Sequence, residues 1–352
     1  MRTKILKSLP PVLLAGTVCW FLFTKPAVCT AGVRAGIQLC GNVVIPSLFV
    51  FMTVASFLLN SGVLGLTGHF LEPVTKRLFH LPGVSAGVIF MGLIGGFPVG
   101  AKMTAQLLSS GHITQNQAMR MCLFCVNAGP AFVISAVGFS ILHSVRAGVI
   151  LYASTTLATL ILGVLTGVLD DRKATYDKRC VTVRLNGVSK SLTKAVSEAA
   201  RSMLMICAWV VLFFAVCACV DTLALPQGAK LFLSSILEVT GGVQAAAGHF
   251  PIPVLAAILS FAGLSVHCQI LSDLQFCGVK GSWFFTARCI SAVISAFLCK
   301  GLLYFFPCEV SVFATNSAIT PVVYSVSVPA FIALIVMSVL LILEVEPNRK
   351  VC

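Results

Sequence analysis

Apolar runs close to twenty residues long follow one another along the chain and leave only short polar segments between them. After a first run at 9–23, they cover approximately 36–59, 84–108, 117–142, 147–169, 203–225, 229–248, 252–274, 283–306 and 325–343. A helix needs about 20 apolar residues to cross about 30 Å of hydrocarbon. The chain is therefore expected to fold within a lipid bilayer.

Composition agrees with a membrane location and excludes several classes of protein. Of the 352 residues, 58% are hydrophobic and 10% are charged, whereas a soluble domain carries about 25% charged residues. The net charge is +13, and eight of the 24 Lys and Arg residues lie between Arg172 and Arg201. A basic segment of this kind is expected to be a loop that faces an anionic lipid leaflet. No stretch is long enough to form a polar domain that binds nucleic acid, so nucleic acid is excluded as a partner.

The first half of the chain predicts a re-entrant hairpin. The positive-inside rule places the basic segments 60–82 and 170–201 on the cytoplasmic side. Three apolar runs lie between them, yet two cytoplasmic segments must be separated by an even number of crossings. The run 84–108 is the candidate for re-entry, because its centre reads Gly-Gly-Phe-Pro-Val-Gly at 95–100. Broken backbone at membrane depth is tolerated only against protein or a water-filled cavity, so the break predicts an interior site.

The second half repeats this plan in the opposite orientation. Lys280 and Arg288 place the start of the run 283–306 in the cytoplasm, so one of the two runs before it is expected to re-enter. Glu-Val-Thr-Gly-Gly at 238–242 interrupts the first of these runs, and Phe-Ala-Gly-Leu-Ser at 261–265 weakens the second. A crossing, a hairpin and a broken crossing in each half indicate an inverted repeat with a substrate site near the midplane.

The predicted fold is all-α, a polytopic integral membrane protein with about eight crossing helices and two re-entrant helical hairpins in an inverted repeat. The expected location is the cell membrane, and both termini are expected in the cytoplasm. The expected divisions are a signal-anchor-like span at 1–35, a first repeat at 36–169, a basic cytoplasmic linker at 170–201, a second repeat at 202–280, and C-terminal transmembrane helices with a short tail at 281–352. Whether the first apolar segment is cleaved stays open.

Polar side chains inside the apolar runs of the first half are the candidates for function, because charge at the bilayer centre is costly. Lys102 follows the first break by two residues, where it faces an anionic group, caps a carbonyl, or extends to the cytoplasmic interface. Asn127 begins the second break, Asn-Ala-Gly-Pro at 127–130. Its amide is suited either to a ligand or to the carbonyl groups that the break leaves free.

In the second half, Glu238 is the most informative carboxylate, since it lies at the expected tip of the second hairpin. It is suited to coordinating Na⁺, to titrating as a proton-coupling group, or to bonding a substrate hydroxyl; the alternative is an interfacial residue facing water. His267 and Gln269 lie mid-run two residues apart. On a regular helix this spacing separates them by about 200°, so they share a face only where the backbone unwinds.

Signals for an enzyme are missing from the sequence. It holds no metalloprotease, nucleophile-elbow or phosphate-loop motif, and its acids are too scattered for a paired-carboxylate site. Cys122 and Cys125 form a C-x-x-C motif without a partner pair, so helix packing is the favoured interpretation over a metal site. The protein is therefore not expected to be an enzyme.

The breaks themselves resemble those of a known family. Gly-Gly-Phe-Pro-Val-Gly-Ala-Lys at 95–102, Ile113-Thr114, and Asn-Ala-Gly-Pro-Ala-Phe at 127–132 resemble the sporulation integral membrane protein YlbJ family, which carries a nucleoside-recognition, or Gate, domain. The segments 237–242 and 260–269 look like that family's second pair of motifs. The family commonly has Ser-Gly-Tyr-Pro where this chain has Gly-Gly-Phe-Pro, which removes two hydroxyl groups from the first break.

The resemblance implies a multi-pass protein of endospore formation that is transporter-like, with a midplane site for a small polar solute and nucleosides among the candidates. The alternative is a non-transporting membrane scaffold or assembly factor of sporulation. No cofactor is expected apart from a coupling Na⁺ or H⁺, and the expected partners are the lipid bilayer, the solute, and either further copies of the chain or sporulation membrane proteins. The residues expected to bind the solute are Gly96, Phe97, Pro98, Gly100, Lys102, Asn127, Gly129, Pro130, Glu238, Thr240, Gly241, His267 and Gln269.

Overall fold

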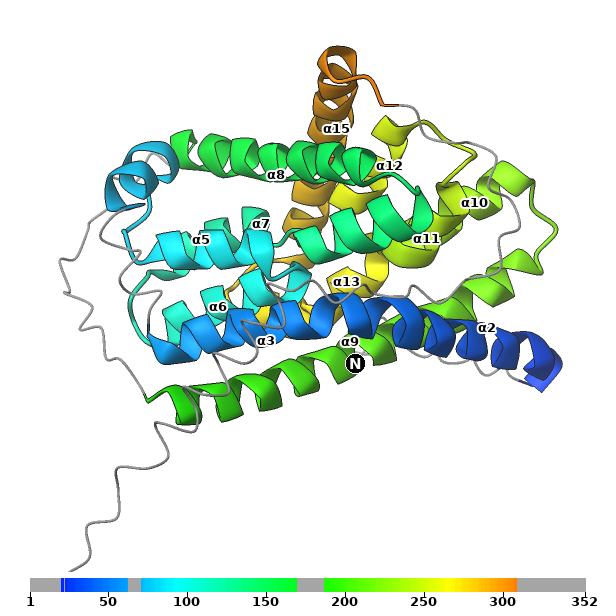
Figure 1. Ribbon diagram of the computed structural model, residues 1–352, viewed down its shortest axis with the longest axis horizontal. Coiled ribbons are helices and arrows are strands. Elements are labelled where there is room, and N and C mark those ends of the chain that lie inside the picture. Colours follow the sequence, from blue (N-terminus) through cyan, green and yellow to red (C-terminus); the bar gives the residue numbers. More distant parts are fainter. Residues whose placement is uncertain (1–19, 22, 63–70, 170–186, 309–352) are drawn as a thin grey trace, which may run out of the picture.

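The computed structural model describes residues 20–21, 23–62, 71–169 and 187–308, and in these residues all regular structure is helical (Figure 1). Most of the expected span at 9–23, the expected span at 325–343, both termini and the first part of the linker 170–201 lie outside the described residues. The elements are α2 (Pro26–Leu39), η1 (Cys40–Val44), α3 (Ile45–Ser61), η2 (Thr75–Phe79), α5 (Ser85–Ile94), α6 (Phe97–Ser109), α7 (Gln115–Phe124), η3 (Ala131–Ile141), α8 (Val145–Val168), α9 (Val188–Asp221), α10 (Gln227–Leu237), α11 (Val239–Ala246), α12 (Ile252–Phe261), α13 (Gly263–Gln269), α14 (Leu271–Phe276) and α15 (Gly281–Phe305).

Both breaks expected in the first half are present. Helices α5 and α6 are separated at Gly95 and Gly96, and Gly96 has φ +86°, which glycine adopts without steric cost. Pro98 lies in the first turn of α6, where its missing N–H leaves no intrahelical hydrogen bond unmade. The second break separates α7 from the π-helical segment η3.

The breaks expected in the second half are also present. A single extended residue, Glu238 with φ −140° and ψ 123°, separates α10 from α11. Ala262, with φ +76°, separates α12 from α13, whose first residue Gly263 has φ +64°. Each of the four runs that was expected to be interrupted is therefore divided into shorter helices.

Two of these broken runs fold back as helical hairpins. In the first, a Cβ atom at Gly100 of α6 would lie 3.3 Å from the Cα of Gly92 in α5. In the second, a Cβ atom at Gly242 of α11 would lie 2.5 Å from the Cα of Ser235 in α10. The contacting residues lie at nearly equal distances before and after each break, so the backbone reverses there.

The segment α2–η1–α3 packs antiparallel along α9, and we call this pair the two-helix layer (residues 26–61 and 188–221). A Cβ atom at Gly32 would lie 2.8 Å from the carbonyl oxygen of Phe214. Further along α3, the side-chain amide of Asn60 donates to Glu198 Oε2 at 2.8 Å. Small residues such as Gly32 let two apolar helices approach closely in a membrane. This close contact sets the register of the two helices in the layer.

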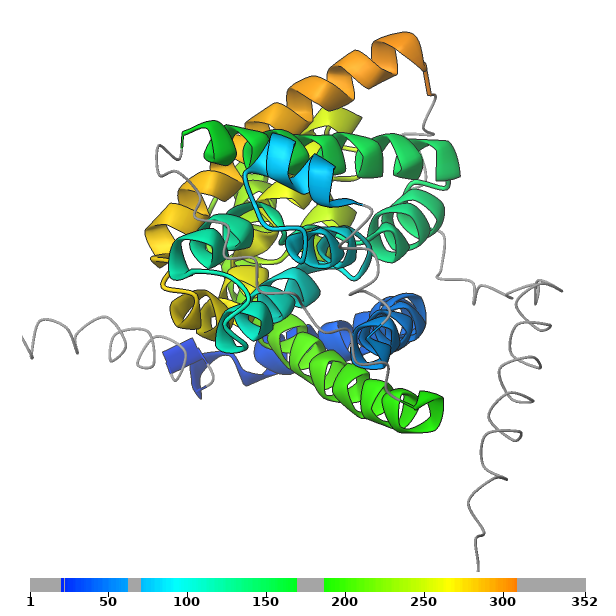
Figure 2. The same ribbon diagram turned by 90° about the vertical axis from the view of Figure 1, so that its left-hand side faces the viewer.

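The remaining helices, η2, α5 to α8 with η3, and α10 to α15, form what we call the hairpin body, and Figures 1 and 2 show the two-helix layer along one side of it. The layer and the body have largely separate apolar cores, although Ala55 of α3 joins the core of the body. The core of the layer consists of Cys40, Val44, Met52, Ala199, Met203, Ile206 and Val210. The contact between layer and body is thus a boundary between two packed units.

Five of the described helical segments are long and apolar enough to cross a bilayer: 26–58, 145–168, 188–221, 252–269 and 281–305. Large apolar side chains on them face outward, including Leu204 at 71% and Phe297 at 73% exposed. In water this surface would be costly, but against lipid tails it is not. The protein is an integral membrane protein with several apolar helices.

Arg288 differs from its expected position at the membrane surface, because it is fully buried on α15. Its guanidinium donates to the carbonyl oxygen of Val126 at 2.6 Å and also to that of Leu123. The carbonyl of Leu123 lies in the last turn of α7 and that of Val126 lies in the break that follows, where neither has a helical partner. The side chain therefore supplies the donors that the second break removes.

We expect Cys29 of α2 and Cys219 of α9 to cross-link readily, because their Sγ atoms lie 3.4 Å apart across the two-helix layer. Mild oxidation with copper phenanthroline should join them with little backbone movement, and mass spectrometry of unreduced peptides would identify the linked pair. Cys289, which is exposed on α15, should not be joined to either residue. Failure to recover the 29–219 link would contradict the antiparallel register of α2 and α9.

Candidate functional site

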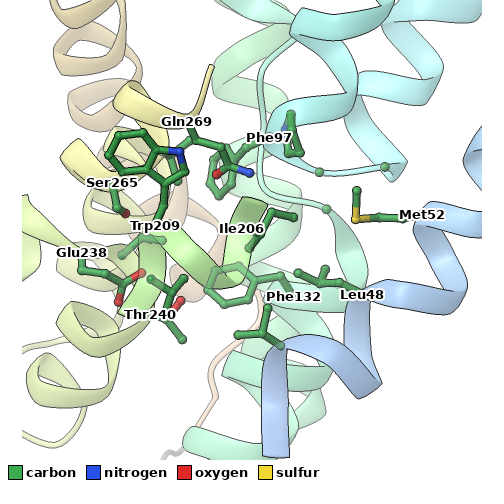
Figure 3. Close-up of a pocket in the computed structure, with 18 residues that line it drawn as sticks. Leu48, Met52, Phe97, Phe132, Ile206, Trp209, Glu238, Thr240, Ser265 and Gln269 are labelled. Carbon is green, nitrogen blue, oxygen red and sulfur yellow. The ribbon is translucent and has the colours of Figure 1, made fainter. Parts of the chain in front are cut away.

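A pocket lies between the two-helix layer and the hairpin body (Figure 3). It has a volume of about 600 Å³, including the part that is open at its mouth. The layer contributes Leu48 and Met52 from α3 and Ile206 and Trp209 from α9. The hairpin body contributes residues from all four helix breaks, so the pocket lies where the interrupted helices meet.

Seven of the thirteen residues expected to bind a solute line this one pocket. The first two breaks supply Gly96, Phe97, Pro98 and Gly129, and the last two supply Glu238, Thr240 and Gln269. These residues span more than 170 positions of the sequence, from 96 to 269. The fold therefore brings together residues that the sequence analysis selected independently in each half, while their role in binding stays a prediction.

In each half, a glycine at the second break contacts the tip of the preceding hairpin. A Cβ atom at Gly129 would lie 2.7 Å from the carbonyl oxygen of Ile94 and 3.1 Å from the backbone nitrogen of Gly96. A Cβ atom at Gly263 would lie 2.9 Å from the backbone nitrogen of Val239. Because any larger residue would meet backbone here, both glycines are needed for the hairpin tips to reach the pocket wall.

Glu238 is the charged side chain of the pocket. It is 1% exposed and is the N-cap residue of α11, where its Oε2 atom accepts a hydrogen bond from the N–H of Gly241 at 2.6 Å. A carboxylate in this position is stabilised by the positive end of the helix dipole. Its other oxygen, Oε1, is buried and has no hydrogen-bond partner among the described residues. The carboxylate thus keeps one acceptor for a ligand.

The opposite hairpin tip is the N-terminus of α6. Helix α6 begins at Phe97, and its N-cap residue Gly96 has no side chain to accept hydrogen bonds from the first turn. In this turn Pro98 has no N–H, and the N–H of Val99 donates to the carbonyl oxygen of Gly96 at 3.2 Å. Gly95, Gly96, Phe97 and Pro98 all line the pocket, so the positive end of α6 faces it.

Three predicted site residues lie outside the pocket for reasons of packing. Gly100 is buried against the carbonyl group of Cys125, where a side chain would clash. Pro130 is the N-cap residue of η3, next to Gly129 but not in the lining. Gly241 does not line the pocket, but its N–H donates to the carboxylate of Glu238.

Lys102 is exposed and lines a second, smaller hollow with Glu198, Gln106 and Ser202. Met52 and Pro98 belong to the walls of both hollows. The lysine is therefore placed on a neighbouring space, near the end of α9 that follows the basic linker, and not beside Glu238.

Asn127 and His267 take part in packing within the hairpin body. Asn127 is fully buried, and its amide nitrogen is 3.4 Å from Thr156 Oγ1. His267 Nδ1 is 2.6 Å from the carbonyl oxygen of Gly263, and its ring contacts those of Phe261, Phe284 and Phe285. Gln269 of the same short helix does line the pocket, in agreement with the angular separation expected for the two residues.

The sequence analysis missed the contribution of the two-helix layer. Trp209, Ile206, Leu48 and Met52 are ordinary members of apolar runs, so only the position of a tryptophan in mid-span distinguished any of them. Nor was Arg288 recognised as a residue that supports a break. Among the described residues, no three His, Cys, Asp or Glu side chains are grouped to hold a metal ion.

Comparisons with known proteins bear on the resemblance that the helix breaks suggested. Residues 43–145 match the family model for Gate, described as nucleoside recognition. The sporulation integral membrane protein YlbJ of Bacillus subtilis (strain 168) is 26% identical over 304 residues, which cover 75% of this chain and 74% of that protein. No solved structure matches the chain. The resemblance predicted from the four breaks is confirmed: residues 43–145 match the Gate model, and three-quarters of the chain is similar to YlbJ.

Proposed function

We propose that this protein carries a small polar solute across the membrane through the pocket between the two-helix layer and the hairpin body. The observation that carries the proposal is the meeting of four helix breaks at one pocket that holds a buried carboxylate. Discontinuous helices around a midplane site are typical of secondary transporters. The relative YlbJ is named as a sporulation integral membrane protein, so we assign the proposed transport to sporulation.

The proposed membrane arrangement is an inverted repeat with about eight crossing helices and two re-entrant hairpins, and with both termini in the cytoplasm. It is supported by the antiparallel packing of α2–α3 and α9, each of which precedes a hairpin in the sequence. It is further supported by the glycine in each half that joins the broken crossing to its hairpin tip.

The proposed motion is a displacement of the two-helix layer against the hairpin body. Their largely separate cores allow each to move as a unit, while the pocket between them opens to one side or the other. The second hollow adjoins the pocket at Met52 and Pro98 and extends toward Lys102 and Glu198. It would serve as the cytoplasmic path, because Glu198 lies near the end of α9 that follows the basic linker.

Glu238 would couple transport to Na⁺ or H⁺, since a buried carboxylate needs either a cation or a proton to lose its charge. Nucleosides are candidate solutes because the matching family is described by nucleoside recognition. Further copies of the chain or other sporulation membrane proteins are its proposed partners.

Filling the pocket should block transport. We expect Leu48→Trp, on the pocket side of α3, to reduce solute uptake at least about tenfold by occupying the space a solute needs. The measurement is uptake of a radiolabelled panel of nucleosides, amino acids and sugars by proteoliposomes containing the purified protein.

Val50→Trp is the matched control, because Val50 lies on the same helix with its side chain 63% exposed toward lipid. This variant should retain wild-type uptake. Transport would be refuted if no solute of the panel entered faster than it enters protein-free vesicles, as a non-transporting assembly factor of sporulation predicts. Equal loss in both tryptophan variants would refute the assignment of the pocket as the route.

A further inference from the structure

One face of α9 carries a row of exposed cations. Lys190, Lys194 and Arg201 are all exposed, and at about 100° per residue they lie within about 40° of one another around the helix axis. The hydroxyl-bearing Thr193 and Ser197 are exposed beside them. Figures 1 and 2 both show α9 at an outer edge of the molecule, so a basic face of this helix is turned away from the hairpin body.

The described part of the chain does not neutralise this row. One acid, Glu198, lies in the same stretch of α9, and its Oε1 atom is 3.9 Å from Nζ of Lys194. Its Oε2 atom accepts a hydrogen bond from Asn60 of α3 instead. Neither Lys190 nor Arg201 forms an ion pair or hydrogen bond with another described residue. Three cations thus share one acid, and the face keeps a net positive charge.

The same face becomes apolar further along the helix. Leu204, Met205 and Leu212 continue it and are 71%, 51% and 47% exposed. Large apolar side chains exposed on a membrane helix are suited to contact with acyl chains. A phospholipid has the same order along its length, a charged headgroup followed by apolar chains, so this face of α9 matches one in both charge and polarity.

The neighbouring helix α3 indicates where the hydrocarbon begins. Near its end, Asn60 meets α9 between Ser191 and Glu198, whose side chains it bonds at 3.3 Å and 2.8 Å. Val50 and Val54 precede Asn60 and are 63% and 50% exposed, and because the two helices are antiparallel they lie level with the part of α9 that follows Glu198.

Arg201 is therefore level with apolar surface, whereas Lys190 and Lys194 lie toward water. An arginine at the edge of the hydrocarbon is costly unless an anion or water reaches it. Lys194 and Arg201 are two helical turns apart on either side of Ser197, so their long side chains can both reach one phosphate group. Lys190 adds positive charge one turn further toward water.

We propose that this face of α9 binds an anionic phospholipid of the bilayer. The headgroup phosphate is bound by Lys194 and Arg201, and the acyl chains lie along Leu204 and Met205. A zwitterionic phospholipid brings a quaternary ammonium group that the cations repel, and a soluble phosphate ester gains nothing from the apolar part of the face. The assignment goes beyond the proposed transport and does not depend on which solute is carried.

The test is lipid titration of the purified wild-type protein in a non-ionic detergent, measured by native mass spectrometry. The probes are dioleoylphosphatidylglycerol, dioleoylphosphatidylcholine and the water-soluble glycerol 3-phosphate. We expect phosphatidylglycerol to bind at least about tenfold more tightly than phosphatidylcholine, because the cations favour an anionic headgroup. Glycerol 3-phosphate at about ten times the lipid concentration should not displace it, because it has no acyl chains.

The triple variant Lys190→Gln/Lys194→Gln/Arg201→Gln identifies the face. All three side chains are exposed, so their replacement leaves the packing of α9 intact. We expect the preference for phosphatidylglycerol over phosphatidylcholine to fall below about threefold, while phosphatidylcholine binds as it does to the wild type.

A matched control removes the same charge from other exposed positions: Arg146→Gln/Lys280→Gln/Lys300→Gln. This variant should keep the wild-type preference. An equal loss in both triple variants would overturn the assignment, because it would show that net charge alone attracts the lipid.

Three further results would overturn it: equal binding of the two phospholipids by the wild type, an unchanged preference in the folded first variant, or displacement by glycerol 3-phosphate. The last result would show that the row binds soluble phosphate esters. The wild-type series decides the matter even where a variant does not fold.

Discussion

Gly100→Ala is expected to destabilise the protein by about 3 kcal/mol or more, because the new Cβ atom would overlap the backbone of Cys125. Gly100 lies on α6, where the first hairpin packs against the end of α7. The contact is with backbone on both sides, so no side-chain rotation can relieve it. The expected result is a lower midpoint of thermal unfolding in detergent, together with loss of the pocket, whose wall includes Phe97, three residues before Gly100.

Gly301→Ala is the matched control, since Gly301 lies in α15 and no atom is within 4 Å of a Cβ built there. Alanine is favoured over glycine in a helix by about 0.5–1 kcal/mol. This control should therefore leave stability unchanged or raise it slightly. A Gly100→Ala protein as stable as wild type would mean that α6 does not pack against α7 at this point.

Arg288→Met is expected to cost about 3 kcal/mol of stability. The substitution removes the donors to the carbonyl groups of Val126 and Leu123 inside the hairpin body. Each buried carbonyl left without a donor costs about 1–3 kcal/mol, and relief from burying the guanidinium offsets part of this cost. Unfolding in detergent would measure the loss of stability. Faster digestion by protease at the second break would show that this segment opens more easily.

Arg288→Lys separates charge from geometry. Lysine keeps the positive charge but cannot match the fork of a guanidinium that bonds two carbonyls, so it should restore only part of the lost stability. Lys300→Met, an exposed position on the same helix, is the control and should change stability little. Full restoration by lysine would show that charge alone accounts for the role of Arg288.

The breaks could be predicted from sequence because they depend on local chemistry. Glycine and proline disfavour a continuous helix wherever they occur, so 95–100 and 261–265 indicated their own interruption. Glu238 was found for the same reason, since a carboxylate within an apolar run stands out without reference to the rest of the chain. Local rules of this kind located the four places that meet at the pocket.

What could not be predicted depends on long-range packing. Nothing local distinguishes Leu48 or Ile206 from the apolar residues that face lipid, because lipid and protein interior favour the same side chains. Arg288 looked like a boundary residue because its acceptors at Val126 and Leu123 lie more than 160 positions away. Lys102 was placed by proximity to the break in sequence, but the direction of its side chain follows from the turn of α6.

The pocket takes its walls from both halves of the chain, and this affects the meaning of the family match. The matched segment 43–145 contains Leu48, Phe97 and Phe132, whereas Trp209, Glu238 and Gln269 lie far beyond its end. A protein fragment limited to that segment would present one wall and no enclosed site. Selectivity can therefore diverge through changes in the second half while the recognisable first half is preserved, so two proteins that share the Gate match need not share a ligand.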